Sequence, residues 1–552
     1  MGKELTARES SEQLWYKQAA DKIFNLLEVN RNHASLSSKR WAWELIQNAK
    51  DVPNKYGKVS IEIERVSERE LLFKHNGNPF DLEKNIWGLI RQVSSKSSVN
   101  KDEEITGKFG TGFICTHLLS DVIVVRGVLK YKGYRQFVLE LDRRGETSEE
   151  LALRIKETEK PFFDAEKYFS EIKDYEENRA EGDYDTEFIY TLDSEEKVKA
   201  AVVGLDDLVN TMPITLVIQA NKIKKVHVID RVRKTDVTYE CEPHPLSENV
   251  VFSEIKINDI VRQNKQCKQY LSYVTDEVIL TTEVVKTENG YTLVKRGDEQ
   301  PVLYRDFPLI GSERFYFPYS LDGFRFNPTD KRDGVHLNSR ESRFARDNRR
   351  IIDHAVEASL KFNEWLIAHN ATNRYLIAYS PKPKPEVDYD EDVALPWINQ
   401  LQANWRAKLL EQQLVESEDG IHSVNEISVP SFPGGASANA EFFNLLDGFY
   451  IGRGYLPKKQ YQEGWLKILN ADYKVWNAKL KYEKDDFLKD LSDLGSVDAL
   501  CQKLNKDEQT VLAWLNKVYV FLIKHKCQDD LKEYAIVPNE EGVFMCIDAM
   551  LS

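Results

Sequence analysis

The chain has 552 residues, of which 41% are hydrophobic and 30% are charged. This is the composition of a soluble globular protein with roughly two to four domains, and it excludes a disordered or membrane-embedded chain. The 76 basic and 90 acidic residues give a net charge of −14. The surface as a whole therefore does not attract nucleic acid. A nucleic-acid partner could bind only at a local basic groove.

We also expect a cytoplasmic protein without a membrane partner. No run of about 18 apolar residues is found, and the first residues alternate charged and apolar side chains, unlike a signal peptide. The six cysteines are scattered without CxxC spacing. This spacing argues against a zinc site and against a disulfide framework.

The first part of the chain combines helices with a sheet. Apolar residues at helical spacing predict helices over residues 10–56, with a second run at 39–52. Residues 143–185 form an acidic insertion that we interpret as solvated surface. Alternating apolar and polar residues predict strands at 59–66, 70–77, 121–129, 134–142, 186–192 and 214–218.

The second part begins with another strand-rich region, residues 222–338, which a predicted helix over 343–369 follows. Alternate prolines in 380–392 indicate a stiff linker or surface loop. Residues 395–526 are mostly helical, and a strand pair with its turn at 539–542 comes last. We predict an α+β fold whose three domains are residues 1–235, an α/β middle domain at 236–385 and a mostly helical domain at 386–552.

Three polar residues share one face of the second predicted helix. Glu44, Asn48 and Asp51 are spaced i, i+4 and i+7, so they project from the same side of the helix. The amide oxygen of Asn48 can ligate Mg²⁺, and the Glu44 carboxylate can orient and deprotonate a water molecule. An ordinary amphipathic helix with a solvated face would show the same pattern.

Two further segments follow this helix within the first 115 residues. A predicted strand ends in His75, Asn76 and Gly77, for which a simple hairpin turn is the alternative. The loop 107–113 then places three glycines before an apolar helix pattern, so that backbone N–H groups and the helix N-terminus can approach an anion. The three segments in this order are more specific than any one of them alone.

Together the segments resemble the GHKL ATPase superfamily, which includes gyrase, the large heat-shock chaperones, histidine kinases and MutL. GKFGTGF is similar to the heat-shock-chaperone branch and HNGxPF to a sacsin-like branch. The resemblance implies a Bergerat α/β sandwich over residues 1–235, with helices on one face of a mixed, mostly antiparallel sheet. The family's ExxxNAxD and GxxGxG boxes are matched by Glu44, Asn48, Ala49 and Asp51, and by Gly107, Gly110 and Gly112.

The resemblance implies ATP and Mg²⁺ as ligands, with Asn48 as the metal ligand. Ser95 and Lys96 lie in a segment that resembles the nucleotide lid, for which a polar loop is the alternative. Thr186 matches a late threonine whose hydroxyl lies near the adenine. The full set of predicted nucleotide contacts is Asn48, Asp51, His75, Asn76, Gly77, Ser95, Lys96, Gly107, Lys108, Phe109, Gly110, Thr111, Gly112, Phe113 and Thr186.

One position departs from the family pattern. In the family's DxGxG box an aspartate accepts a hydrogen bond from the adenine amino group, whereas this sequence has His75 there and Pro79 in place of the second glycine. A neutral imidazole accepts one hydrogen bond through its bare nitrogen, and Asn76 offers an amide oxygen. The choice between adenine and guanine is therefore open.

Residues 307–338 look like the segment that follows the ATPase domain in sacsin-like bacterial proteins, where a basic loop reaches the γ-phosphate. Lys331 and Arg332 are the candidates, because a cation there stabilises charge on the transferred phosphoryl group. An exposed charged turn is the alternative. With Glu44, these two residues make up the predicted catalytic set.

The resemblance implies a slow ATPase that drives a conformational clamp or a chaperone-like cycle, in a homodimer or with a partner protein chain. Related proteins act in bacterial antiviral defence or DNA processing. The alternative is a nucleotide sensor or scaffold that binds ATP without significant turnover. A histidine kinase is disfavoured because no dimerisation helix with a phosphoacceptor histidine precedes the pocket, and a nuclease because no PD…ExK or HNH spacing is found.

Overall fold

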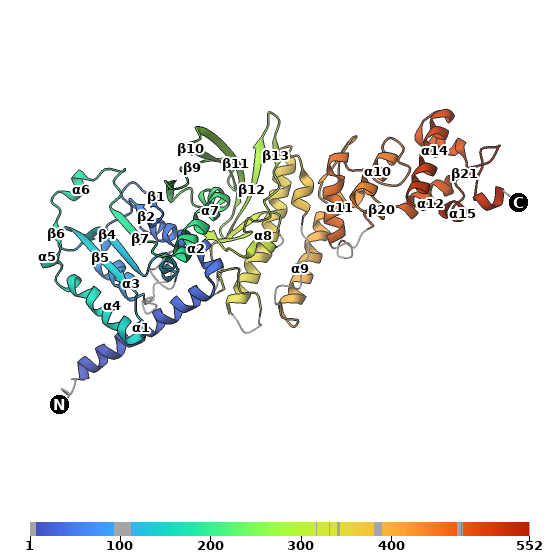
Figure 1. Ribbon diagram of the computed structural model, residues 1–552. Coiled ribbons are helices and arrows are strands. Elements are labelled where there is room, and N and C mark those ends of the chain that lie inside the picture. The colour runs from blue at the N-terminus through green and yellow to red at the C-terminus, as the bar shows by residue number, and fades with distance from the viewer. Residues whose placement is uncertain are drawn as a thin grey trace.

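The computed structural model describes residues 7–92, 112–315, 317–329, 332–338, 343–379, 389–471, 476 and 479–550. The molecule is elongated, with helix α1 projecting at one end and the last helices at the other (Figure 1). A large mixed sheet with helices packed on it forms the N-terminal part, and small helices with short strand pairs form the C-terminal part. The fold class is thus mixed α+β.

The described residues form one 16-stranded sheet. Its order is β15-β14-β16-β12-β11-β10-β9-β8-β1-β2-β7-β4-β5-β6, with β13 beside β12 and β3 beside β4. The strands are β1 (Val59–Ser67), β2 (Glu70–His75), β3 (Phe80–Asp81), β4 (Val122–Lys130), β5 (Tyr134–Asp142), β6 (Ser170–Glu171), β7 (Thr186–Thr191), β8 (Ile223–Asp230), β9 (Thr235–Pro245), β10 (Val250–Asp259), β11 (Asn264–Val274), β12 (Val278–Lys286), β13 (Tyr291–Leu293), β14 (Leu303–Arg305), β15 (Phe307–Pro308) and β16 (Ser320–Gly323).

Strand β8 joins the two regions that the sequence separates at residue 235. It pairs with β1 in parallel, with Val226 opposite Ile61, and with β9 antiparallel, with Val226 opposite Tyr239. The strands on either side of the predicted boundary are therefore hydrogen-bonded in one sheet. The division into separate domains there stays a prediction.

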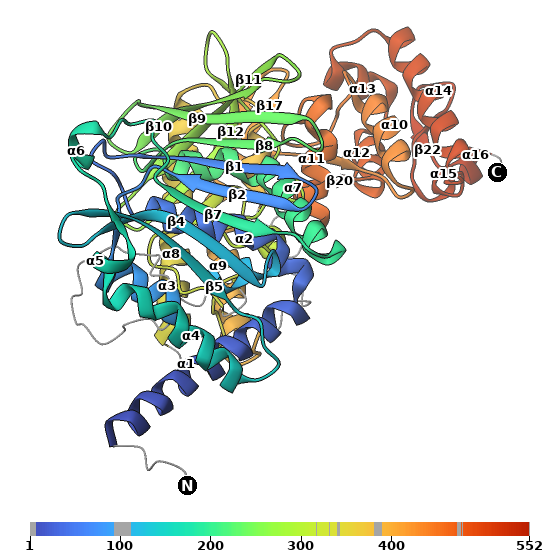
Figure 2. The same ribbon diagram turned by 60° about the vertical axis from the view of Figure 1, so that its left-hand side comes forward.

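Helices cover one face of the N-terminal strands, as Figure 2 shows for α1, α2 and α4 behind β1, β2, β7, β4 and β5. Helices α2 and α7 touch closely, because Trp41 Nε1 donates to Ala200 O at 3.1 Å and Gly204 lies against the Trp41 ring. The helical segments of this region are α1 (Ala7–Asn32), α2 (Ala34–Lys50), η1 (Leu82–Ile86), α3 (Trp87–Arg91), η2 (Phe113–Leu118), α4 (Ser148–Phe163), α5 (Ala165–Tyr168), α6 (Tyr175–Asn178) and α7 (Glu195–Ile218).

The strands predicted at 59–66, 70–77, 121–129, 134–142 and 186–192 are confirmed as β1, β2, β4, β5 and β7, but the one at 214–218 is wrong. That segment is the last part of α7, whose N-cap Ser194 accepts a hydrogen bond from Lys197 N at 3.3 Å. Its β-branched residues favour a strand by propensity, but burial on all sides of the helix overrides that preference.

The interpretation of residues 143–185 as solvated surface is also wrong. Helix α4 lies in this insertion and buries Leu151, Ile155 and Phe162 in the core. Its Glu159 is fully buried and accepts a hydrogen bond from Arg91 Nε at 2.5 Å. The insertion thus contains a packed helix with a buried apolar side and one buried carboxylate.

A second hydrophobic cluster packs strands β10 to β16 against helix α8 (Arg343–Ala368) and continues into the C-terminal segments, where it includes Trp405 and Trp465. Helix α8 confirms the helix predicted over 343–369. A third cluster lies in the C-terminal part. The remaining segments are η3 (Ser312–Arg314), η4 (Arg374–Ala378), α9 (Ala394–Leu409), β17 (Val415–Ser417), β18 (Gly420–His422), η5 (Val424–Glu426), β19 (Val429–Ser431), α10 (Ala436–Leu446), η6 (Lys459–Tyr461), α11 (Gln462–Ala471), β20 (Lys481–Glu483), α12 (Lys484–Leu494), α13 (Val497–Leu504), α14 (Glu508–Lys524), α15 (Asp530–Glu533), β21 (Val537–Pro538), β22 (Phe544–Met545) and α16 (Ile547–Met550).

Helix α7 is, among the described helices, the one that is long and apolar enough to cross a membrane. About two thirds of its most apolar window is nevertheless buried inside the protein, 67% by residue. Its apolar character is that of a helix packed in a protein core.

Candidate functional site

Helix α2 carries the first candidate motif into the interior of the protein. Trp41, Leu45 and Ile46 are fully buried, and they hold the helix against the core. The polar residues are buried as well, since Glu44 is 6% exposed and Asn48 is 8% exposed. The alternative of a solvated polar face is therefore wrong, and these polar groups require partners within the protein or on a ligand.

Glu44 lies where three segments of the chain meet. Its Oε1 accepts a hydrogen bond from Arg332 Nη1 at 2.6 Å and lies 3.5 Å from Arg40 Nη2. Its Oε2 lies beside Gly112, where a Cβ atom would come within 2.0 Å of this oxygen. The end of the glycine loop thus touches the carboxylate, and only a residue without a side chain permits that approach.

Arg332 reaches Glu44 from a tight turn far along the chain. Arg332 N donates to Thr329 O at 2.9 Å, and Pro328 and Val335 close the turn as an antiparallel bridge. Arg332 has a φ of 51°, in the left-handed region that side chains other than glycine rarely adopt. Its ion pair with Glu44 is incompatible with the alternative of a turn whose charge faces only water.

Asn48 lies one turn beyond Glu44 on α2, and its amide is buried. The Nδ2 atom has no hydrogen-bond partner among the described residues, which is rare for a buried amide. The oxygen of an anion such as a phosphate would accept a hydrogen bond from this nitrogen, and the amide oxygen is of the ligand type that Mg²⁺ prefers. The residue therefore fits a metal-bound phosphate.

Asp51 caps the C-terminal end of helix α2 and belongs to a series of ion pairs that reaches Asp306. Asp51 Oδ1 lies 3.1 Å from Lys50 Nζ, and Lys50 Nζ lies 3.5 Å from Asp306 Oδ2. The Lys50 side chain is completely buried between the two carboxylates. The C-terminal end of the helix is thereby fixed to the segment that precedes β15.

His75 is the last residue of β2 and is almost completely buried. Burial, with a smaller contribution from the positive charge of Arg179, lowers the pKa of His75 to about 3, so the imidazole is neutral. Its Nδ1 accepts a hydrogen bond from Gly77 N at 3.1 Å. The proton of the neutral ring therefore sits on Nε2, and the bare nitrogen that the sequence assigned to the base is already occupied.

Asn76 does not offer its amide to a ligand as the sequence predicts. Its Oδ1 accepts a hydrogen bond from Ser60 N at 2.7 Å, and its Nδ2 donates to Glu181 O at 2.6 Å. Gly77 is held close to helix α2, because a Cβ atom there would come within 2.7 Å of Val52 O. Asn76 and Gly77 thus position the loop after β2. From the sequence, both residues are predicted to bind the nucleotide.

Arg179 is a site residue that the sequence prediction missed. Its Nη2 donates to Asn76 O at 2.7 Å and to Gly77 O at 2.6 Å, and its Nε lies 2.5 Å from Asp185 Oδ2. It comes from the insertion that was interpreted as solvated surface. The only sequence signal was a lone basic residue among acidic ones, and a close ion pair cannot be inferred from that.

Thr186 lies opposite His75, and Phe113 joins the same core through the ring of Phe188. Thr186 opens β7 directly opposite His75 and is buried. The Phe188 ring lies 5.8 Å from that of Phe113 and 6.2 Å from that of Phe73. The structure thus brings together a buried histidine, a buried threonine and three aromatic rings.

Several predicted site residues lie outside the described residues. These are Ser95, Lys96, Gly107, Lys108, Phe109, Gly110, Thr111 and Lys331. Of the glycine loop, Gly112 and Phe113 are described, and they begin the short 3-10 helix η2, which ends at Leu118. The longer apolar helix expected after the loop is wrong, because β4 begins at Val122.

Among the described residues, no group of three or more His, Cys, Asp or Glu side chains is placed to hold a metal ion. The candidate metal ligand therefore remains Asn48. Mg²⁺ commonly binds proteins in this way, through one or two side chains together with phosphate oxygens and water.

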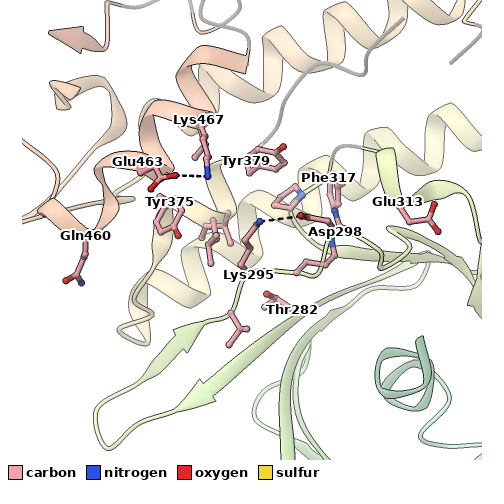
Figure 3. Close-up of a pocket in the computed structure, with 17 residues that line it drawn as sticks. Thr282, Lys295, Asp298, Glu313, Phe317, Tyr375, Tyr379, Gln460, Glu463 and Lys467 are labelled. Carbon is pink, nitrogen blue, oxygen red and sulfur yellow. Dashed lines mark hydrogen bonds and ion pairs between the residues drawn. The ribbon is translucent and has the colours of Figure 1, made fainter. Parts of the chain in front are cut away.

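A separate cavity of about 640 Å³ lies between the segments that follow β12 and helix α11 (Figure 3). Its polar wall includes two ion pairs, Lys295 with Asp298 at 3.3 Å and Lys467 with Glu463 at 2.9 Å. Tyr375 lies next to Glu463 in the view. None of these residues belongs to the predicted site.

Comparison of the sequence with models of protein families gives no match, and neither does comparison with curated proteins.

Proposed function

We propose that the chain is a Mg²⁺-dependent nucleoside triphosphatase of the GHKL type, with ATP as the substrate that the resemblance implies. In this proposal the N-terminal part is a Bergerat sandwich, and slow hydrolysis drives a conformational clamp or chaperone-like cycle. The protein would act in the cytoplasm, within antiviral defence or DNA processing, as a homodimer or with a partner chain. The projection of α1 from the body supports a contact with a second chain (Figure 1).

The observation that carries the proposal is the meeting of three segments at Glu44. A carboxylate in contact with the end of a glycine loop and with a guanidinium is an arrangement suited to phosphoryl transfer to water. Glu44 and Arg332 lie 288 residues apart in the chain, so no local turn or helix explains their contact.

Each residue then has a distinct role. Glu44 orients and deprotonates the attacking water, and Arg332 stabilises the charge that develops on the γ-phosphate. Asn48 holds the metal ion, which when bound neutralises phosphate charge. Gly112 allows the phosphate-binding backbone to approach Glu44.

One observation favours the alternative of a nucleotide sensor without significant turnover. Arg332 already occupies Glu44 Oε1 at 2.6 Å, with Arg40 at 3.5 Å. A carboxylate oxygen that two guanidinium groups already contact is less free to bind and orient an attacking water molecule. In this alternative the ion pair reports nucleotide binding rather than supporting hydrolysis.

Calorimetric titration of the full chain with MgATP, alongside measurement of phosphate release, tests the proposal. We expect Asn48→Ala to abolish binding, and Glu44→Ala to keep binding while turnover falls by about 10²- to 10⁴-fold. Gly112→Ala should impair both, because its Cβ would displace Glu44 Oε2. Gly334→Ala is the matched control, since its Cβ would meet nothing within 4 Å.

The results separate the two functions. Binding that depends on Asn48, without measurable turnover in the unaltered chain, would establish the sensor. Absence of heat with every purine triphosphate would overturn both.

A further inference from the structure

We propose that the base end of this site selects purines that carry a hydrogen-bond acceptor at C6, such as guanine and hypoxanthine, over adenine. The inference rests on the proposed nucleotide site and names its substrate class more closely. It follows from the arrangement around His75. The ring is neutral with its proton on Nε2, and the hydrogen-bond acceptors around it already accept bonds from other groups of the protein.

The first step is to decide which end of the site receives the base. Glu44 and Asp51 are separated by seven residues of helix α2, which is about 10 Å along the helix axis. The Glu44 end carries the guanidinium groups of Arg332 and Arg40, which suit phosphates. The other end meets the loop after β2, where Asn78 N donates to Val52 O at 2.9 Å.

The side chain of His75 lies beside aromatic rings of the core. The Phe73 ring lies 6.2 Å from the His75 ring and 6.2 Å from the Phe188 ring, and all three residues are buried. Charged phosphates are excluded from such surroundings by the cost of desolvation, which leaves this end of the site to the uncharged base.

The second step is an account of hydrogen-bond acceptors at this end. His75 Nδ1 accepts from Gly77 N, and Asn76 Oδ1 accepts from Ser60 N. The backbone oxygen of Asn76 accepts from Asn54 Nδ2 at 2.9 Å and from Arg179 Nη2 at 2.7 Å. Each of these acceptors is thus already bonded within the protein.

What His75 presents to a ligand is a donor. Exchanging the tautomer would place a proton on Nδ1 and set it against the N–H of Gly77, which removes a buried hydrogen bond and leaves two donors facing each other. The lowered pKa keeps the ring neutral throughout the physiological range. Thr186, opposite His75, bears a hydroxyl that adapts to either partner and therefore does not discriminate.

Guanine and hypoxanthine carry an acceptor at C6, whereas adenine carries an amino donor there. An amino group that meets a buried donor forfeits its hydrogen bonds to water without replacement. The expected discrimination is about 10- to 100-fold in Kd, from the cost of one unpaired buried polar group.

The experiment compares the dissociation constants of ATP, GTP and ITP with Mg²⁺ for the full chain by isothermal titration calorimetry. We expect ITP and GTP to bind alike and about 10- to 100-fold more tightly than ATP. Equal affinity of ITP and GTP would assign the preference to the C6 oxygen rather than to the 2-amino group of guanine. His75→Asp, which offers an acceptor, should reverse the order.

The control variant is His227→Gln. His227 lies on β8 and contacts Glu62 and Asp236 from the opposite face of the sheet, so its loss should leave the order unchanged. Thermal unfolding checks that each variant folds. Should His75→Asp not fold, His75→Asn, whose amide both donates and accepts, should bring the three affinities together.

The two proposals fail in different ways. Binding of ATP as tight as that of ITP, or tighter, with loss of both in Asn48→Ala, would overturn the base selection and leave the nucleotide site intact. If none of the three nucleotides binds, the proposed function itself fails.

Discussion

Buried ionisable groups at the site show how a single residue acquires its chemistry. The sequence alone allows His75 to be a donor, an acceptor or a cation, because its ordinary pKa lies within the physiological range. Burial and the N–H of Gly77 leave one form, the neutral ring with its proton on Nε2. The residue type was visible in the sequence, whereas its protonation state depends on contacts that only folding creates.

Asp322 gives a testable pH dependence at the same scale. Its carboxyl group is buried on β16, and burial together with the nearby Asp306 carboxylate raises its pKa from 3.8 to about 7. Between these two pH values the folded state keeps the proton of Asp322, whereas the unfolded state has largely released it. The free energy of unfolding therefore falls as the pH rises from about 4 to 7, by up to about 4 kcal/mol from this group.

We expect Asp322→Asn to flatten this slope and to raise the melting temperature at pH 8, as measured by thermal unfolding across the pH range. The amide oxygen can still accept the hydrogen bond that Asp306 N donates to Asp322 Oδ1 at 2.7 Å. Asp419→Asn is the control, because its side chain is 63% exposed and should leave the slope unchanged. Equal slopes for Asp322→Asn and the unaltered chain would show that this carboxyl is not the cause.

At the scale of elements, a close contact between α2 and α7 positions the helix that carries the site. Gly204 on α7 faces Trp41 on α2, and a Cβ atom there would come within 2.1 Å of Trp41 Nε1 and 2.9 Å of Ser38 O. The tryptophan is fixed by its hydrogen bond to Ala200 O at 3.1 Å. Neither partner has room to yield.

We therefore expect Gly204→Ala to destabilise the N-terminal part by about 1–3 kcal/mol through overpacking, although alanine favours helices more than glycine does. Chemical denaturation followed by tryptophan fluorescence measures the effect. Gly182→Ala is the matched control, since nothing lies within 4 Å of its Cβ position. A Gly204→Ala variant as stable as the control would contradict the packing argument.

The elements themselves were predictable to different degrees. Strands β1, β2, β4, β5 and β7 follow alternation of apolar and polar residues, because each has one face in the core. The segment 214–218 defeated the same reasoning, since a short apolar run carries no periodicity that distinguishes a strand from a helix buried on all sides. Helix α4 was missed because its charged outer face dominated the composition of its segment.

At the scale of the whole molecule, Lys50 connects helix α2 with the segment between β14 and β15. Its ammonium group lies between Asp51 and Asp306, and 5.4 Å from the centre of the Phe307 ring. Trp43 packs on the same ring, with the ring centres 5.9 Å apart. Together with the ion pair of Glu44 and Arg332, this contact fixes the site to the segments that follow β13.

We expect Lys50→Met to cost about 3–5 kcal/mol, because it removes a fully buried cation from between two partly buried carboxylates. Loss of the contact should also expose the segment around Asp306 to limited proteolysis. Lys256→Met is the control, since that residue pairs with Glu242 on the surface, with 58% of its side chain exposed, and exposed pairs contribute little. Unchanged stability and an unchanged cleavage pattern in Lys50→Met would refute the role of this contact.

The sequence by itself determined that residues 44, 48 and 51 share a helical face, that a strand ends at His75 and that a mixed α+β fold results. These features follow from periodicity over a few residues, which reports the sides of a chain that leave water. Only the tertiary structure decided that Arg332 pairs with Glu44, that Arg179 holds the loop at Asn76, and that His75 Nδ1 is taken up by the N–H of Gly77. The first two pairings join residues 288 and 103 positions apart, whereas the third is local and owes its effect to the burial of His75. They depend on the completed packing of the core and leave no periodic trace in the sequence.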